Sequence, residues 1–131
     1  MASATPCKGA ILLIEDDPVV SHVLERMLRL AGYDVVAARD ASAGLRAMAA
    51  AAPAAVLVDL RMPMMNGLEL VRQIRERETN GRHTPIAVIT ADYCLDDTIT
   101  HRLRELQAEL YFKPLWLDDL RQIVDTLVDT P

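Results

Sequence analysis

The sequence predicts a single α/β domain in which a parallel sheet is covered by helices on both faces. Short, mostly apolar runs alternate five times with segments whose apolar residues recur at helical spacing. Apolar runs of this kind are typical of strands buried on both faces, and such strands occur in parallel sheets covered by helices. With 131 residues, 51% of them hydrophobic, the chain is suited to one compact domain with a substantial core.

The predicted elements follow one another with little between them. Residues 1–9 are small and polar, and we expect a loose tail there, followed by one domain over residues 10–129. The apolar runs predict strands at residues 10–14, 34–38, 54–58, 85–89 and 109–112. The helical stripes consist of Val20, Val23, Leu24, Met27 and Leu30; Leu45 and Met48; Leu68, Val71 and Ile74; Leu95, Ile99, Leu103 and Leu106; and Leu117, Leu120, Val124 and Leu127.

Capping residues locate several of the helix ends. Asp17 followed by Pro18 is typical of an N-cap with proline at the first helical position, and Gly32 is a stop signal. Asp40 is placed to cap a second helix over residues 41–52. In the third helix, the arginines at positions 72, 75 and 77 are interpreted as a solvated face, with a binding patch as the alternative.

Composition excludes several classes of protein. A net charge of −5 argues against a nucleic-acid-binding surface, which is usually basic. No apolar stretch is long enough to span a bilayer, and the first residues do not form a secretory leader, so we expect a cytoplasmic protein that does not bind membranes. Cys7 and Cys94 lack the spacing of a zinc site and are expected to be reduced thiols.

Polar side chains stand at the ends of four predicted strands. They are Glu15 and Asp16 after the first, Asp59 after the third, Thr90 after the fourth and Lys113 after the fifth. Parallel strands bring these ends to one edge, where two carboxylates about 4 Å apart repel by roughly 4 kcal/mol at an effective dielectric constant of about 20. Such a cluster needs a cation or a proton, and oxygen ligands without His or Cys favour Mg²⁺.

A magnesium site with a lysine and a hydroxyl nearby indicates phosphoryl chemistry. Mg²⁺ and Lys neutralise the oxygens of a transferring phosphoryl group. The sequence has no glycine-rich phosphate loop, so a nucleotide is not expected to be the donor held by this chain. A carboxylate can itself act as the nucleophile and form an acyl phosphate, and Asp59 is the candidate.

Taken together, these stretches resemble the receiver domain of two-component response regulators. The matching segments are ILLIEDDP at the first strand, LVDLRMPMMNGLEL around Asp59, VITA at Thr90 and FKP at Lys113. The resemblance covers roughly residues 9–128. It implies a flavodoxin-like fold with five parallel strands in the order 2-1-3-4-5.

The resemblance also implies roles for individual residues. Asp59 would accept a phosphoryl group from the phosphohistidine of a sensor kinase or phosphotransfer protein. Asp16 and Asp59 would bind Mg²⁺ directly, Glu15 through water, and the backbone carbonyl of Arg61 would complete the protein ligands.

Two further residues would respond to the phosphoryl group. Lys113, before a cis bond to Pro114, would contact its oxygens, and Thr90 would move toward it. The sequence departs from the family at one position: the residue three before the lysine is Leu110 where the family usually has an aromatic residue, and Tyr111 follows it. Side chains alternate along a strand, so Tyr111 should point to the opposite face, and coupling between Tyr and Thr is in question.

Several other side chains are given simpler interpretations. Trp116 is expected to pack at a helix start rather than to be a binding hot spot for a partner protein, and the histidines are expected at the surface. The methionines near Asp59 are expected to pack in a loop. These residues are His22, His83 and His101, and Met62, Met64 and Met65.

The leading hypothesis is a phosphoaccepting switch that acts on a downstream protein, with a possible homodimer through the face of the fourth helix, fifth strand and fifth helix. One alternative is a receiver-like interaction module that does not use phosphorylation. A second is a magnesium phosphohydrolase, which usually carries an acid two residues after its nucleophile. That position is Arg61 here.

Overall fold

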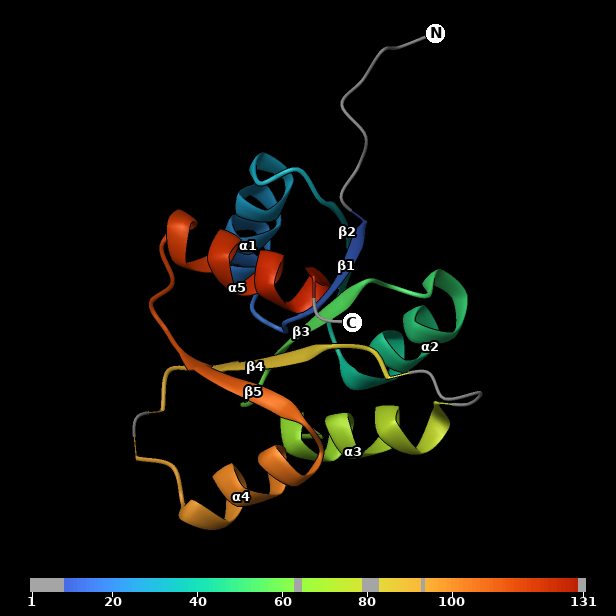
Figure 1. Ribbon diagram of the computed structural model, residues 1–131, viewed down its shortest axis with the longest axis vertical. Helices are drawn as coiled ribbons and strands as arrows, with labels where there is room; N and C mark the ends of the chain where they lie inside the picture. Colours follow the sequence, from blue (N-terminus) through green and yellow to red (C-terminus); the bar gives the residue numbers. More distant parts are fainter. Residues whose placement is uncertain (1–8, 63–64, 79–82, 93, 130–131) are drawn as a thin grey trace, which may run out of the picture.

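Five parallel strands form the central sheet in the order β2-β1-β3-β4-β5, as the resemblance implied (Figure 1). The computed structural model describes residues 9–62, 65–78, 83–92 and 94–129. The strands are β1 (Ala10–Ile14), β2 (Asp34–Ala38), β3 (Ala55–Asp59), β4 (Ile86–Thr90) and β5 (Ala108–Phe112). The helices are α1 (Pro18–Leu30), α2 (Ala41–Ala51), α3 (Gly67–Arg77), α4 (Asp97–Glu105) and α5 (Leu117–Asp129).

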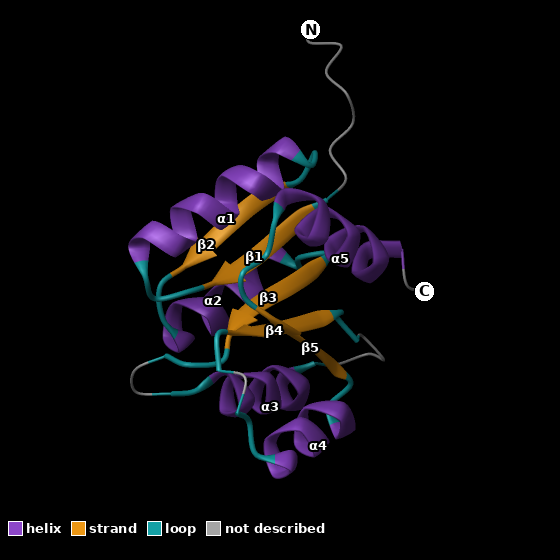
Figure 2. Cartoon of the chain, turned by 90° about the vertical axis from the view of Figure 1, so that its left-hand side faces the viewer, coloured by secondary structure: helices purple, strands orange, loops and turns teal. Residues whose placement is uncertain are grey.

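The helices are divided between the two faces of the sheet (Figures 1 and 2). The connection through α1 runs from β1 to one neighbour of β1, whereas those through α2, α3 and α4 run in the opposite direction across the sheet. Since crossovers between parallel strands are right-handed, reversing the direction places α1 on one face and α2, α3 and α4 on the other. The last helix, α5, packs beside α1.

Two apolar clusters follow from this division. Successive residues of a strand point to opposite faces. In β1, Ile11 and Leu13 therefore pack in the cluster under α1 and α5, whereas Leu12 and Ile14 pack in the cluster under α2, α3 and α4. All four are almost completely buried. The residues of β3 and β4 are buried as well, whereas the edge strands β2 and β5 contain exposed residues.

The ends of several elements differ from the prediction by a residue, for identifiable reasons. Pro85 has no N–H and donates no strand hydrogen bond, although its carbonyl accepts one from Val56 N; β4 begins at Ile86. The strand predicted at 54–58 lies at Ala55–Asp59. As a result, Asp59 and Thr90 are the last residues of their strands, where backbone pairing holds them.

Helix ends agree well with the capping signals. Asp17 Oδ1 accepts hydrogen bonds from Val19 N at 2.8 Å and Val20 N at 3.2 Å, as expected of an N-cap. Asp40 caps α2 through Ala43 N. The helix predicted over 41–52 ends one residue earlier because Ala52 adopts a left-handed conformation with φ 46°.

The tail and some loop residues fall outside this description. Of the predicted tail, residues 1–9, the structure describes Gly9, whose carbonyl accepts a hydrogen bond from Asp34 N. Cys7 and Met64 also lie outside the described residues. None of the helices that the structure describes has the length and apolar character needed to cross a bilayer.

Arg75 is not part of a solvated face, and that interpretation of the α3 arginines is wrong for this residue. Its side chain is 10% exposed and pairs with Glu78 at 2.8 Å. Its guanidinium also donates to three backbone carbonyls: those of Leu106, Thr84 and Gln107. Arg75 therefore ties α3 to the turn between α4 and β5. The sequence does hold a signal, since Arg75 lies four residues after the buried Val71 on the same side of the helix.

We expect Arg75→Gln to lower the free energy of unfolding by about 2 kcal/mol, because the partly buried carbonyls of Leu106 and Thr84 lose a charged donor. Arg77→Gln, on the exposed side of the same helix, is the matched control and should change it by less than about 0.5 kcal/mol. Urea denaturation followed by circular dichroism measures both. Equal effects of the two substitutions would contradict a role for Arg75 in joining these elements.

Candidate functional site

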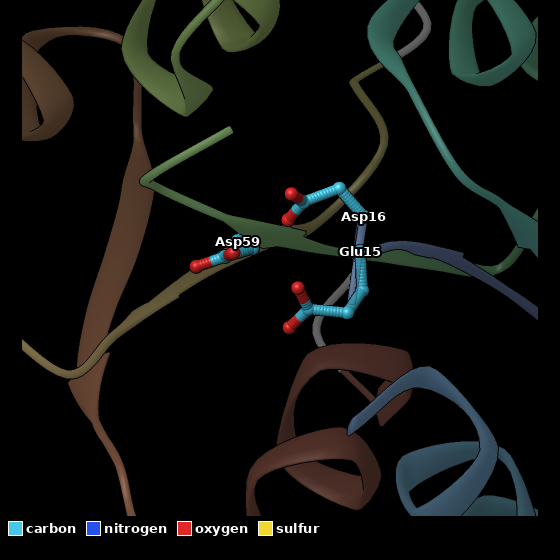
Figure 3. Close-up of side chains that lie close together, drawn as sticks. All are labelled: Glu15, Asp16 and Asp59. Carbon is cyan, nitrogen blue, oxygen red and sulfur yellow. The ribbon is translucent and has the colours of Figure 1, made fainter. Parts of the chain in front are cut away.

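Three carboxylates meet at the carboxyl edge of the sheet. Glu15 and Asp16 follow β1, and Asp59 ends the neighbouring strand β3. Each offers an oxygen, and these oxygens lie within 4.8 Å of one another. Figure 3 shows the carboxylates gathered on the same side of the strand ends. Between β1 and β3 the direction of the crossovers reverses, which is where ligands bind in open α/β sheets.

Lys113 provides positive charge beside this cluster. It follows β5, and its backbone N–H donates to the Thr90 carbonyl at 2.8 Å. Its Nζ lies 2.9 Å from Glu15 Oε1 and 3.8 Å from Asp59 Oδ1. The bond from Lys113 to Pro114 is cis, as the resemblance implied. A residue 98 positions away in the sequence thus contacts Glu15 directly.

The described side chains of this cluster carry more negative than positive charge. Glu15 is 2% exposed, and this burial raises its pKa, while the hydrogen bond from Lys113 acts in the opposite direction and the neighbouring Asp59 raises the pKa further. Lys113 pairs with Glu15 and Asp59, and Asp16 adds a third carboxylate to the cluster. An additional cation would relieve the repulsion, and a set of carboxylate oxygens suits a hard ion such as Mg²⁺.

Thr90 reaches the same edge from β4. Its side chain is completely buried, and its Oγ1 accepts a hydrogen bond from Asp92 N at 3.0 Å. β4 lies between β3 and β5, so Thr90 stands between the strand that carries Asp59 and the strand that leads to Lys113. A hydroxyl that accepts one hydrogen bond can donate another.

Arg61 and Asp92 form a contact that sequence reasoning missed. The backbone N–H of Arg61 points at Asp59 Oδ1 over 3.4 Å, and its guanidinium pairs with Asp92. Arg61 lies two positions after Asp59, the last residue of β3. Asp92 lies two positions after Thr90, the last residue of β4. Because neighbouring parallel strands end at one edge of the sheet, residues that follow the two strand ends at the same distance in sequence can come into contact. This equal spacing was the sequence signal that could have predicted the pair.

Glycine 67 allows α3 to begin close to the site. A Cβ at this position would lie 2.8 Å from the Asp59 carbonyl oxygen and 2.8 Å from Leu60 Cα, both backbone atoms. The Gly67 N–H donates to the Leu60 carbonyl at 2.8 Å. The start of α3 is therefore packed directly onto the segment that carries Asp59.

Leu110 and Tyr111 point to opposite faces, as predicted. Leu110 packs in the cluster under α2, α3 and α4, whereas Tyr111 packs in the cluster under α1 and α5. The Tyr111 hydroxyl donates to Glu109 Oε2 at 3.0 Å. On the side of β5 that packs under α4, the chain thus has the aliphatic side chain of Leu110 where the resemblance leads one to expect an aromatic residue.

The remaining predictions have mixed outcomes. Trp116 was expected to pack at a helix start, but its side chain is 71% exposed, so that interpretation is wrong. Its backbone N–H does bond to Asp119 at the start of α5. The surface prediction holds for His22, His83 and His101, which are all exposed. Met62 and Met65 are partly buried, as expected of loop packing. Cys94 is an exposed free thiol.

The chain belongs to the response regulator receiver domain family, whose model matches residues 11–125. The response regulator MprA of Mycolicibacterium vanbaalenii is 36% identical over 113 residues, which are 84% of this chain and 46% of that protein. The sensory/regulatory protein RpfC of Xanthomonas campestris pv. campestris is 42% identical over 83 residues, 62% of this chain and 11% of that protein. The chain thus spans less than half of either relative.

Solved structures share the fold. The receiver domain of the sensor histidine kinase PA1611 from Pseudomonas aeruginosa is 32% identical, with a TM-score of 0.81 over 93% of this chain and 98% of that one. That structure is described as having a magnesium ion coordinated in the active site cleft. The chemotaxis protein CheY4 of Vibrio cholerae has a TM-score of 0.81 over 90% of this chain and 97% of that one, at 23% identity.

Magnesium binding should depend on pH through Glu15. Protons compete with metal ions for carboxylates, and since the pKa of Glu15 is raised above its usual 4.5, the loss of affinity on acidification should begin at a higher pH than for an ordinary glutamate. Isothermal titration calorimetry with Mg²⁺ between pH 5 and pH 8 measures this dependence. Glu15→Gln should weaken binding about tenfold at neutral pH and flatten its pH dependence.

The control for this experiment is Glu76→Gln, which removes an acid whose side chain is 60% exposed on α3. It should leave both the affinity and its pH dependence unchanged. Equal Mg²⁺ affinities for the Glu15→Gln protein and the unchanged chain at neutral pH would remove Glu15 from the metal site.

Proposed function

We propose that this chain is a phosphoaccepting switch that takes a phosphoryl group onto Asp59 from the phosphohistidine of a sensor kinase or a phosphotransfer protein. The observation that carries the proposal is the convergence of the Glu15, Asp16 and Asp59 carboxylates with the Lys113 ammonium at one sheet edge. Family membership and the place of receiver domains in histidine kinase and response regulator systems support the choice of donor.

The chain's own residues account for the transfer. An Asp59 carboxylate oxygen attacks phosphorus, the bond from phosphorus to the donor's imidazole nitrogen breaks, and an acyl phosphate forms on Asp59. Lys113, already 3.8 Å from Asp59 Oδ1, then pairs with a phosphoryl oxygen. The Thr90 hydroxyl donates to another. Attack of water on phosphorus later releases inorganic phosphate and restores the carboxylate.

Mg²⁺ fits the carboxylate oxygens of Glu15, Asp16 and Asp59. Asp16 and Asp59 would bind it directly, Glu15 would act through water, and the Arg61 backbone carbonyl would be a further ligand. When bound, it supplies positive charge that offsets both the carboxylates and the phosphoryl oxygens. The three carboxylate oxygens, which lie within 4.8 Å of one another, support this assignment, because a cation offsets their mutual repulsion.

An apolar groove beside the site offers a docking surface for the phosphoryl donor. It has a volume of about 260 Å³ and lies between α1 and the segment after β5, lined by Val20, Val23, Met27, Lys113, Pro114 and Leu115 among others. Val19 and Val23 are 70% and 49% exposed on the rim. Because Lys113 belongs to both the groove and the acidic site, a helix of the donor seated in the groove would bring its phosphohistidine toward Asp59.

The output is assigned to the face of α4, β5 and α5. β5 is an edge strand, and Phe112 at its end is 39% exposed, which suits contact with a protein partner or a second copy of the chain. The net charge of −5 does not favour direct contact with nucleic acid. The domain is thus a signalling module that catalyses only its own phosphorylation and dephosphorylation.

Two alternatives have less support. A receiver-like module that does not use phosphate has no need of the buried Glu15 and the lysine that contacts it. A magnesium phosphohydrolase would carry an acid where Arg61 stands, and the Arg61 guanidinium is paired with Asp92 instead. We therefore favour the phosphoaccepting switch.

Acetyl phosphate with Mg²⁺ should label the chain with one phosphoryl group, and Asp59→Asn should abolish this labelling because the amide cannot form the acyl phosphate. Intact-protein mass spectrometry measures the stoichiometry. Asp34→Asn, at the exposed start of β2, is the control and should be labelled normally. Normal labelling of the Asp59→Asn protein would refute the proposal. So would the absence of labelling in the unchanged chain.

Val23→Glu should lower the rate of phosphotransfer about tenfold or more, because it places a charge in an apolar contact. The donor in this assay is a histidine kinase that phosphorylates the unchanged chain. The substitution should leave labelling by acetyl phosphate unchanged. Leu30→Glu is the matched control, since Leu30 is 70% exposed at the other end of α1. A Val23→Glu protein that accepts phosphoryl from the kinase at the normal rate would exclude the groove as the docking surface.

A further inference from the structure

Arg61 and Asp92 link two loops across the carboxyl edge of the sheet. Arg61 lies in the segment from β3 to α3 and Asp92 in the segment from β4 to α4, and Arg61 Nη2 pairs with Asp92 Oδ2. The two side chains are 56% and 33% exposed, so the pair is in contact with water. Exposed ion pairs contribute little to stability. The guanidinium can therefore exchange this partner for a more strongly charged one.

Asp92 is connected to Thr90 and to the loop that leads to α4. Its backbone N–H donates to Thr90 Oγ1 at 3.0 Å, and its Oδ1 accepts from Cys94 N at 2.9 Å. The Cys94 N–H, followed by the Arg61 guanidinium, lowers the pKa of Asp92, so this carboxylate is ionised at neutral pH. A ligand that draws the Arg61 guanidinium away from Asp92 therefore changes the contacts of the segment that directly follows Thr90.

Arg61 is also next to Asp59. Its backbone N–H lies 3.4 Å from Asp59 Oδ1, and its side chain already extends over this edge of the sheet to Asp92. Phosphorylation would place a charge of about −1.5 to −2 and additional oxygens at this position. A guanidinium binds phosphoryl oxygens through two parallel hydrogen bonds, a stronger contact than the exposed pair with one carboxylate.

On the basis of the proposed function, we propose that Arg61 is a phosphoryl-sensing residue that leaves Asp92 for the phosphoryl group on Asp59 and so releases the segment between β4 and α4. The exchange needs no covalent step beyond the transfer itself. It offers a route from the site to α4 in a chain where Leu110, packed under α4, has no hydroxyl to report the position of Thr90.

The exchange makes Asp92 a competitor of the phosphoryl group for Arg61. Removing the charge of Asp92 should then strengthen phosphoryl binding, and it should do so only while Arg61 is present. If the ion pair instead held Arg61 ready for the phosphoryl group, removing Asp92 would weaken binding. The sign of the effect therefore distinguishes the two arrangements.

Isothermal titration calorimetry of the full chain with beryllofluoride, a phosphoryl mimic, in the presence of Mg²⁺ measures this sign. Asp92→Asn should tighten binding about threefold, and Arg61→Gln should weaken it about tenfold. The double variant should bind like Arg61→Gln alone. Asparagine keeps an oxygen for the Cys94 N–H, and glutamine keeps the Arg61 backbone carbonyl.

Asp97→Asn is the control for charge, because Asp97 is an exposed acid in the first turn of α4, and it should have no effect. Weaker binding by the Asp92→Asn protein would overturn the proposal. So would a tightening that persists in the Arg61→Gln background, since it would reflect charge alone. If the unchanged chain does not bind beryllofluoride, or Asp59→Asn binds it equally well, the proposed function itself fails and this inference with it.

A second readout follows the loop directly. Hydrogen exchange of the Asp92 and Cys94 amides should become faster when beryllofluoride binds to the unchanged chain. In the Asp92→Asn protein the exchange should respond less to the mimic, because the ion pair is already absent. Slower exchange on binding would show that the loops are drawn together, which contradicts release.

Discussion

The candidate site is governed by the repulsion among three carboxylates held at one edge of a rigid sheet, a repulsion that Lys113 partly offsets. Glu15 is almost completely buried, yet it lies beside Asp59 and keeps Lys113 within 2.9 Å. Burial and a neighbouring negative charge are both unfavourable for a carboxylate. The folded chain maintains this arrangement because the strands that carry these groups are fixed by pairing and packing on both faces.

That arrangement explains why the site can respond to a change of charge. The phosphoryl group that we propose for Asp59 would add negative charge to this cluster of carboxylates, and nearby cations would then reorganise around it. Lys113, the Thr90 hydroxyl and the Arg61 guanidinium each come from a different strand end. A change at Asp59 can therefore act on several loops at once, including the segment before α4.

Much of the fold could be predicted because its signals are local. Wholly apolar runs mark strands buried on both faces, Asp17 and Asp40 mark helix starts, and both cap the helices as expected. The approximate edge position of the Glu15, Asp16 and Asp59 carboxylates also follows, since parallel strands end together. Errors of one residue arose where backbone bonding decided the boundary, as at Pro85 and Ala52.

The sequence by itself determined the order of strands and helices, the residues that stand at the strand ends and the alternation that separates Leu110 from Tyr111. Only the tertiary structure decided that Arg75 is buried against the turn after α4, that the Trp116 ring is exposed, and that Arg61 pairs with Asp92. The physical reason is that periodicity reports which side of an element faces the core. The partner of a long charged side chain depends on which other elements come within its reach.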